Sequence, residues 1–205
     1  MSRDGKTITF TIREGVVWHD GTPFTAEDVK WTFEYYPTVP GANTVMTDVI
    51  NDAASIEIDG NKVVFTFNNP QPNALTVFSQ WPILPKHLLE KVTPENFAAD
   101  TFWQMPIGTG PFKVETVKLG EDTTMVRNAE YYKTGTGNIE KIYLYPSTDA
   151  GDTNLITNAQ AGNIDYAFCK DSAQVQQLQD MEGYNVETVN VTFPRYIFVN
   201  MFERG

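Results

Sequence analysis

The sequence is poor in the residues that most often bind metals or cross-link chains. Its 205 residues include one cysteine, Cys169, and two histidines, His19 and His87. A single cysteine excludes a disulfide within the chain and any metal site that needs several cysteines. It does not indicate a compartment, because a large exported protein with a good core needs no disulfide. We therefore expect neither a metal nor a cofactor.

Long apolar runs and an excess of positive charge are also missing. No apolar run approaches the roughly 20 residues that cross a bilayer. The first strand-like pattern begins at Thr7 and leaves no room for a signal peptide, so an exported protein would carry its targeting segment outside this chain. The chain has 15 basic and 26 acidic residues and a net charge of -11. Such a surface repels phosphate backbones and anionic lipids, so nucleic acid is not an expected partner.

Catalytic sequence motifs are scarce. The chain contains no Gly-x-Ser-x-Gly, His-Glu-x-x-His or Gly-x-x-x-x-Gly-Lys-Ser/Thr motif. The GTG at residues 108–110 could suggest a phosphate loop, but Pro111 and a strand-like pattern follow it, whereas a phosphate loop needs a helix N-terminus. The alternative is a tight bend in which glycine lets two segments approach closely. We favour the bend.

One stretch places a histidine beside a carboxylate. Residues 16–31 read VVWHDGTPFTAEDVKW, in which His19 precedes Asp20, and Glu27 and Asp28 follow. An acid/base or metal site here would need a second histidine or further ligands nearby. The alternative is structural, because an Asp-Gly pair favours a turn, and carboxylates in a first helical turn complement the positive end of the helix dipole. We favour the structural interpretation.

Thr25 marks the expected start of the first helix. It stands three residues before Asp28, and apolar residues then recur at helical spacing up to Tyr36. Thr25 is therefore the predicted N-cap. Pro37 is expected to end the helix.

Alternating apolar and polar residues predict several strands. Residues 7–12, TITFTI, indicate a half-buried strand. Residues 56–67 contain two apolar-alternating runs joined by Asp-Gly-Asn, which is a strong hairpin pattern. A second hairpin is expected over 106–128, turning at Gly120, and a further strand over 139–146.

The remaining segments mix helices with strands. Short helices are expected within 71–85 and over 86–92, followed by a polar connector over 93–105 that contains a little helix. The expected order then is helix, strand, helix, strand, strand, over 149–161, 164–168, 172–181, 184–191 and 195–202. This alternation is typical of an α/β unit, so the predicted fold class is α/β with mixed α+β character.

Three aromatic residues lie beside turn residues: Trp81, Trp103 and Tyr196. A rigid aromatic side chain near a glycine- or proline-rich loop can form the wall of a ligand pocket. Such side chains more often belong to the core, and this alternative stays open for all three. Trp18 and Trp31 are expected in the core because they belong to the first strand's exit and the first helix.

Several motifs occur together in a characteristic order. Residues 7–35 read TITFTIREGVVWHDGTPFTAEDVKWTFEY. There follow VVFTF with PQP, ILPKHLLE, PIGTGPFKV, VRNAEYY before IEKIYLYP, AGNIDYA and PRYIFVNMF. This series resembles the extracellular solute-binding proteins of family 5, the peptide- and nickel-binding components of ABC importers. The resemblance covers nearly the whole chain, and Ala129 and Tyr132 are minor departures from it.

The resemblance implies a two-lobed clamp of α/β domains of the periplasmic-binding-protein type II kind, of which this chain would be an incomplete first lobe. Residues 1–105 would form a small hairpin-rich subdomain, 106–193 an α/β subdomain, and 194–205 the crossover toward a missing second lobe. The resemblance assigns no catalytic role to residues 16–31. The apolar run over 195–202 would leave a strand edge unpaired, so self-association of the fragment is expected at high concentration.

By the same resemblance, the protein is expected to be a non-enzymatic substrate-binding component of an ABC importer. It would capture short peptides in the periplasm, or as a lipoprotein on the outer face of the cytoplasmic membrane, and deliver them to permease subunits for transmembrane transport. A nickel chelate or an oligosaccharide is the alternative ligand. A hydrolase using Asp20 and His19 is the alternative from another class. The candidate ligand-binding residues, chosen because they join elements at subdomain borders, are Trp81, Gly108, Thr109, Gly110, Tyr196 and Asn200.

Overall fold

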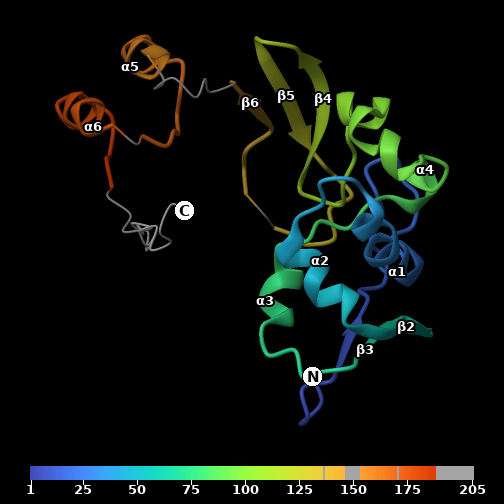
Figure 1. The fold of residues 1–205 in the computed structure, drawn as a ribbon. Coiled ribbons are helices and arrows are strands. Elements are labelled where there is room, and N and C mark those ends of the chain that lie inside the picture. Colours follow the sequence, from blue (N-terminus) through green and yellow to red (C-terminus); the bar gives the residue numbers. More distant parts are fainter. Residues whose placement is uncertain (136, 146–152, 170, 188–205) are drawn as a thin grey trace, which may run out of the picture. The chain divides into compact units, whose positions relative to one another are not determined.

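The computed structural model describes residues 1–135, 137–145, 153–169 and 171–187 (Figure 1). The chain divides into two compact units, Met1–Pro146 and Ser147–Gly205. The subdomain boundary expected near residue 105 falls inside the first unit, where hydrogen bonds join His19 to the 108–110 segment. The division at 105 and 193 stays a prediction.

The first sheet has three antiparallel strands in the order β1-β3-β2, namely β1 (Thr7–Thr11), β3 (Lys62–Phe67) and β2 (Ala53–Asp59). The expected strand and hairpin are confirmed. Asp59 pairs with Lys62 across a two-residue turn, in which Gly60 adopts φ of 60°. Such a positive φ is one that glycine adopts without steric cost.

Helices cover one face of this sheet and complete an aromatic core. The helices of this part are α1 (Ala26–Tyr35), η1 (Tyr36–Thr38), α2 (Thr44–Asn51) and α3 (Ala74–Ser79). Phe33 of α1 packs against Phe65 of β3 and Phe78 of α3, with ring centroids 5.0 and 4.7 Å apart. Helix α1 ends before Pro37, as expected. Helix α2 was not predicted from the sequence; its N-cap is Asn43, whose side chain accepts a hydrogen bond from the backbone of the first turn.

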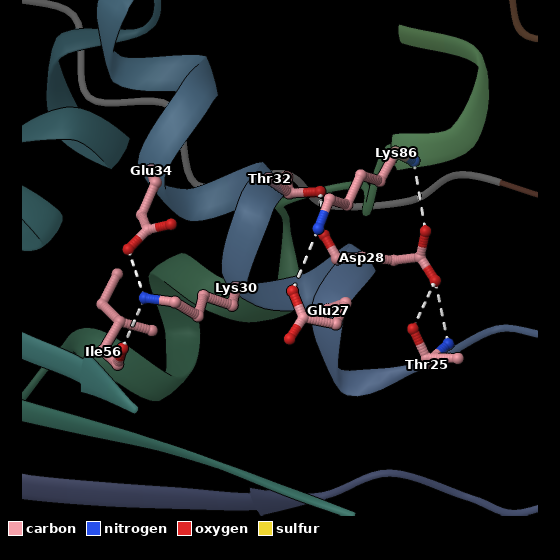
Figure 2. Close-up of polar contacts among 8 residues, drawn as sticks. All are labelled: Thr25, Glu27, Asp28, Lys30, Thr32, Glu34, Ile56 and Lys86. Atoms are coloured by element: carbon pink, nitrogen blue, oxygen red, sulfur yellow. Dashed lines mark hydrogen bonds and ion pairs between the residues drawn. The ribbon is translucent and has the colours of Figure 1, made fainter. Parts of the chain in front are cut away.

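Helix α1 is fixed to its surroundings by polar side chains on one of its faces (Figure 2). Asp28 is only 5% exposed, and its carboxylate accepts hydrogen bonds from the Thr25 N–H at 2.8 Å and the Lys86 N–H at 3.1 Å. One turn later, the buried Thr32 hydroxyl donates to the Asp28 carbonyl at 2.7 Å and accepts from the Leu84 N–H at 2.9 Å. These contacts join α1 to the segment that leads into α4 (Lys86–Leu89).

The prediction that Thr25 caps α1 is confirmed. Thr25 has extended dihedral angles and forms a reciprocal capping box with Asp28. Its hydroxyl lies 3.1 Å from the same Asp28 oxygen that accepts its backbone N–H.

Replacement of Thr25 by alanine is therefore expected to lower the free energy of unfolding by about 0.5–2 kcal/mol, because the helix start loses a capping hydroxyl. Urea denaturation measures this change. Thr25→Ser keeps the hydroxyl and should stay near the native stability. Loss of ligand binding without loss of stability would show instead that the segment faces ligand.

A second, smaller core lies under the connector that follows. It contains Val39, Leu84, Leu89 and Phe97. The short helices over it are α4 (Lys86–Leu89), η2 (Pro94–Ala99) and η3 (Thr101–Gln104). Most of the connector over 93–105 is thus 3-10 helix, which is more helix than was expected, and α4 ends three residues earlier than predicted.

The second sheet of this unit is also three-stranded and antiparallel. Its order is β4-β5-β6, namely β4 (Phe112–Lys118), β5 (Asp122–Arg127) and β6 (Lys141–Leu144). Lys118 pairs with Asp122 across the predicted turn at Gly120, which has φ of 78°. The predicted hairpin and the strand after it are confirmed.

The described residues of the second unit form the helices α5 (Thr153–Gln160) and α6 (Ser172–Gln179), both at predicted places. Leu155 and Ala159 of α5 pack with Leu178 of α6 in a small core. The Tyr184 hydroxyl lies 3.0 Å from the Ala159 carbonyl, which fixes the segment after α6. Within the part of the chain that the structure describes, no helix is long and apolar enough to cross a membrane.

The strand predicted over 164–168 is wrong. This segment has no strand partner among the described residues, and Tyr166 and Phe168 are 77% and 78% exposed. The segment is apolar, but a strand also requires a neighbour for its backbone hydrogen bonds. Of the run predicted over 184–191, residues 184–187 form no strand, and the rest lies outside the described residues, as does the strand predicted over 195–202.

Candidate functional site

The GTG bend is attached to the N-terminal part of the chain through one histidine. The backbone N–H of His19 donates to the Gly108 carbonyl at 2.9 Å. The Gly108 N–H in turn donates to His19 Nδ1 at 3.1 Å, and His19 Nε2 lies 3.1 Å from the Gly110 carbonyl oxygen. One imidazole ring therefore contacts both ends of the bend. The prediction that GTG brings two segments together is confirmed.

These contacts determine which ring nitrogen of His19 carries the proton. Because Nδ1 accepts a hydrogen bond from a backbone N–H, it has no proton, and Nε2 is the donor to the Gly110 carbonyl. Burial lowers the pKa of His19, although the hydrogen bond to Gly110 raises it. The ring is thus neutral near pH 7.

Asn128 secures the other side of the bend. Its side-chain amide donates to the Gly110 carbonyl at 3.0 Å, and its backbone N–H donates to the Pro111 carbonyl at 2.8 Å. The side chain is buried, and its oxygen accepts from the Glu130 N–H at 3.1 Å. Sequence analysis did not single out this residue, because an asparagine between a strand and a turn carries no distinctive pattern.

The glycines of the bend are not required by steric crowding. Neither Gly108 nor Gly110 has a positive φ. A Cβ added at Gly108 would lie 3.7 Å from His19 Cε1, which is an ordinary contact. The close approach comes from the hydrogen bonds of His19, and the prediction that glycine makes it possible is wrong at Gly108.

Asp20 does not contact the ring of its neighbour His19 but pairs with the other histidine. Its Oδ2 lies 2.8 Å from His87 Nε2, and its Oδ1 accepts from the Thr22 N–H at 3.0 Å. Burial raises the pKa of the Asp20 carboxyl, but the hydrogen bonds from Thr22 and His87 outweigh this effect and lower it. Among the described residues, no three His, Cys, Asp or Glu side chains gather as a metal site would require. The structural interpretation of residues 16–31 fits these partners.

The structure separates the aromatic candidates. Trp81 is 5% exposed and packs against Phe33 and Tyr36, with ring centroids 4.8 and 5.2 Å apart. Trp103 is 41% exposed, and its indole N–H donates to the Phe97 carbonyl. The Trp81 ring thus lies in the aromatic core of the first unit. Its ligand-binding role stays a prediction.

Two other candidates, Tyr196 and Asn200, lie outside the described residues. Of the predicted set, the structure therefore describes Trp81 and the bend residues Gly108, Thr109 and Gly110.

A hollow between α2 and α3 was not predicted. Its volume is about 390 Å³, and amide side chains share its lining with apolar ones and a threonine. The lining residues are Asn43, Met46, Asn73, Thr76, Val77 and Gln80. Side-chain amides can both donate and accept hydrogen bonds, so the hollow suits an uncharged polar group. No sequence signal pointed to it, because its residues come from two helices and the loops beside them.

The chain resembles known proteins along nearly its whole length. The profile of the family described as bacterial extracellular solute-binding proteins, family 5 Middle, matches residues 1–203. A protein of Brucella ovis named as an ABC transporter peptide-binding protein is 32% identical over 188 residues, which cover 91% of this chain and 34% of that protein.

Two solved structures that share the fold contain a bound ligand. The crystal structure of NikZ from Campylobacter jejuni in complex with Ni(L-His) matches with a TM-score of 0.74 and 29% identity, covering 89% of this chain and 35% of NikZ. The oligopeptide-binding protein AppA from Bacillus subtilis, in complex with a nonapeptide, matches with a TM-score of 0.65 and 26% identity, covering 80% of this chain and 32% of AppA. The chain spans about a third of the length of these relatives. With a family match over residues 1–203, the chain belongs to the bacterial extracellular solute-binding proteins of family 5.

Proposed function

We propose that this chain is part of the substrate-binding component of an ABC importer that captures short peptides outside the cytoplasmic membrane and delivers them to permease subunits. The observation that carries the proposal is the 32% identity, over 91% of the chain, to a protein named as an ABC transporter peptide-binding protein. AppA, which shares the fold at 26% identity, was solved with a nonapeptide. Ligand binding would favour the closed form of the clamp through contacts made only in that form.

Two surfaces of the described chain are suited to a peptide. The amides around the α2–α3 hollow can pair with the N–H and C=O groups of a peptide backbone. The GTG bend presents backbone groups of its own, and its shape is fixed by His19 and Asn128. We propose that the bend residues Gly108, Thr109 and Gly110 contact the ligand. Trp81, Tyr196 and Asn200 are further candidates.

Mass spectrometry of the small molecules that co-purify with the natural protein containing this chain tests the proposal. A set of short peptides, released on denaturation, is the expected result. Isothermal titration calorimetry with trialanine and pentaalanine should then give saturable binding. Absence of both would overturn the peptide assignment.

A nickel chelate is the second candidate ligand, because NikZ, at 29% identity, was solved with Ni(L-His). The donor atoms of such a ligand can come from the chelator, so a chain with few histidines can still bind it. Titration with nickel and histidine at a 1:2 ratio, beside histidine alone, separates this candidate from peptide binding. The relatives named above are binding proteins. The hydrolase alternative, which uses Asp20 and His19, would require measurable substrate turnover that His19→Ala abolishes.

A further inference from the structure

The His19 ring contacts the GTG bend in two chemically different ways. At one end its Nδ1 accepts the Gly108 N–H, and at the other its Nε2 donates to the Gly110 carbonyl. The Gly110 carbonyl has a second donor, the Asn128 side chain at 3.0 Å. The Gly108 carbonyl also accepts from the His19 backbone N–H at 2.9 Å. The ring is thus the described side-chain partner of the Gly108 N–H, and a backbone hydrogen bond holds this end as well.

We propose that His19 is the positioning residue of the Gly108–Gly110 bend, that it acts only as the neutral Nε2–H tautomer, and that protonation of its ring breaks its hydrogen bond with the Gly108 N–H. Residues 89 positions apart in the sequence are then coupled through a single proton site.

The reason lies in the donor and acceptor inventory of imidazole. A neutral ring has one acceptor nitrogen and one donor nitrogen, which is what the two ends of the bend require. An imidazolium has two donors, so its Nδ1–H would face the Gly108 N–H across the 3.1 Å that now separates the two nitrogens. That arrangement replaces a hydrogen bond with the repulsion of two donors. The Gly110 carbonyl still accepts from Nε2 and from Asn128, and the Gly108 carbonyl still accepts from the His19 backbone N–H. The hydrogen bond that is lost is therefore the one at the Gly108 N–H.

Two charged groups near the His19 ring have opposite effects on its protonation. Lys113, on β4, disfavours the imidazolium, and Asp20, next to His19 in the same turn, favours it. The Asp20 carboxylate is already engaged with His87 and the Thr22 N–H. Burial is the largest influence and holds the pKa of His19 below its usual range.

The sign of the pH effect follows from this depressed pKa. Below about pH 6.5 the unfolded chain binds more protons at His19 than the folded chain does. The contribution of the bend to stability is therefore complete above that pH and is lost as the pH falls toward the folded pKa. Acidification, and not alkalinity, should free the Gly108 N–H.

Nuclear magnetic resonance of the 205-residue chain tests the proposal directly. Ring nitrogen shifts at pH 7.5 should show the Nε2–H tautomer for His19. Between pH 7.5 and 4.5, protection of the Gly108 amide against hydrogen exchange, corrected for intrinsic exchange, should fall about tenfold, the change expected when one net hydrogen bond is lost. The Asn128 side-chain amide signals should change little. An Nδ1–H tautomer at pH 7.5 would overturn the proposal.

Two variants test the two ring nitrogens of His19 separately. His19→Asn offers an amide oxygen near the position of Nδ1 and should keep Gly108 protected at every pH. His19→Gln offers an amide nitrogen near the position of Nε2 and should leave Gly108 unprotected at every pH. His87→Gln removes the partner of Asp20 and should leave the pH profile of Gly108 as in the native chain. A native profile in His19→Asn would show that another group titrates.

The consequence for ligand binding rests on the proposed function. If the bend contacts peptide, calorimetry of the natural protein with trialanine should show affinity that falls with acidification in the native sequence and not in His19→Asn. Affinity that is constant with pH while the Gly108 amide responds would support the role of His19 and remove the bend from the ligand site.

Discussion

Replacement of Trp81 by alanine is expected to lower the free energy of unfolding by about 3–5 kcal/mol, the range for deleting a buried large aromatic side chain. The indole is 5% exposed and packs between Phe33 and Tyr36, at centroid distances of 4.8 and 5.2 Å. Phe33 also packs against Phe65 and Phe78, so a cavity at Trp81 opens beside the centre of the aromatic core. Urea denaturation followed by circular dichroism measures the change.

Trp103→Ala is the matched control. This indole is 41% exposed, and its removal costs chiefly one hydrogen bond and partial burial. We expect about 1–2 kcal/mol for it, in line with one hydrogen bond and part of an apolar side chain. Equal losses for the two tryptophans would contradict the core position of Trp81.

The ligand-binding role predicted for Trp81 needs a gentler substitution. Trp81→Phe keeps an aromatic ring in the core and should change the fold less than alanine does. If Trp81 contacts peptide, this variant of the natural protein should still lose affinity for pentaalanine, by at least about 1 kcal/mol as for a binding anchor. Unchanged affinity would assign Trp81 to the core alone.

Replacement of Asp28 by alanine is expected to lower the free energy of unfolding by about 3 kcal/mol, because two backbone donors lose their acceptor at about 1–3 kcal/mol each. The donors are the N–H groups of Thr25 and Lys86, which start α1 and α4. The carboxylate is 5% exposed, so water has little access to replace it. The loss should therefore loosen both helix starts together (Figure 2).

Glu27→Ala is the control for Asp28→Ala. Glu27 is the neighbouring carboxylate, is mostly exposed, and pairs with the Lys86 ammonium at 3.0 Å. Exposed ion pairs contribute at most about 1 kcal/mol. Asp28→Asn keeps one acceptor oxygen and should fall between the two. A large loss in Glu27→Ala would mean that charge at this helix start, and not acceptance of backbone N–H groups, determines stability.

Local patterns were sufficient for the elements whose partners lie nearby in the sequence. The hairpin of β2 and β3 followed from alternation around Asp-Gly-Asn, and the start of α1 followed from Thr25 and Asp28. Helix α2 was missed although Asn43 is a good N-cap residue. The strand expected over 164–168 failed because a short apolar run does not supply the neighbouring strand that its backbone hydrogen bonds require.

The sequence by itself determined the family, through the order of its motifs, and most of the helices and hairpins, because caps, turns and alternation act over a few residues. The tertiary structure decided what the chemically notable side chains do. His19 and Asp20 are adjacent, yet their side chains bind groups 89 and 67 positions away, at Gly108 and His87. Packing of distant segments sets such partners, and sequence proximity carries no information about them. For the same reason, only the fold could place Trp81 in the aromatic core and give His19 the tautomer that its two backbone partners require.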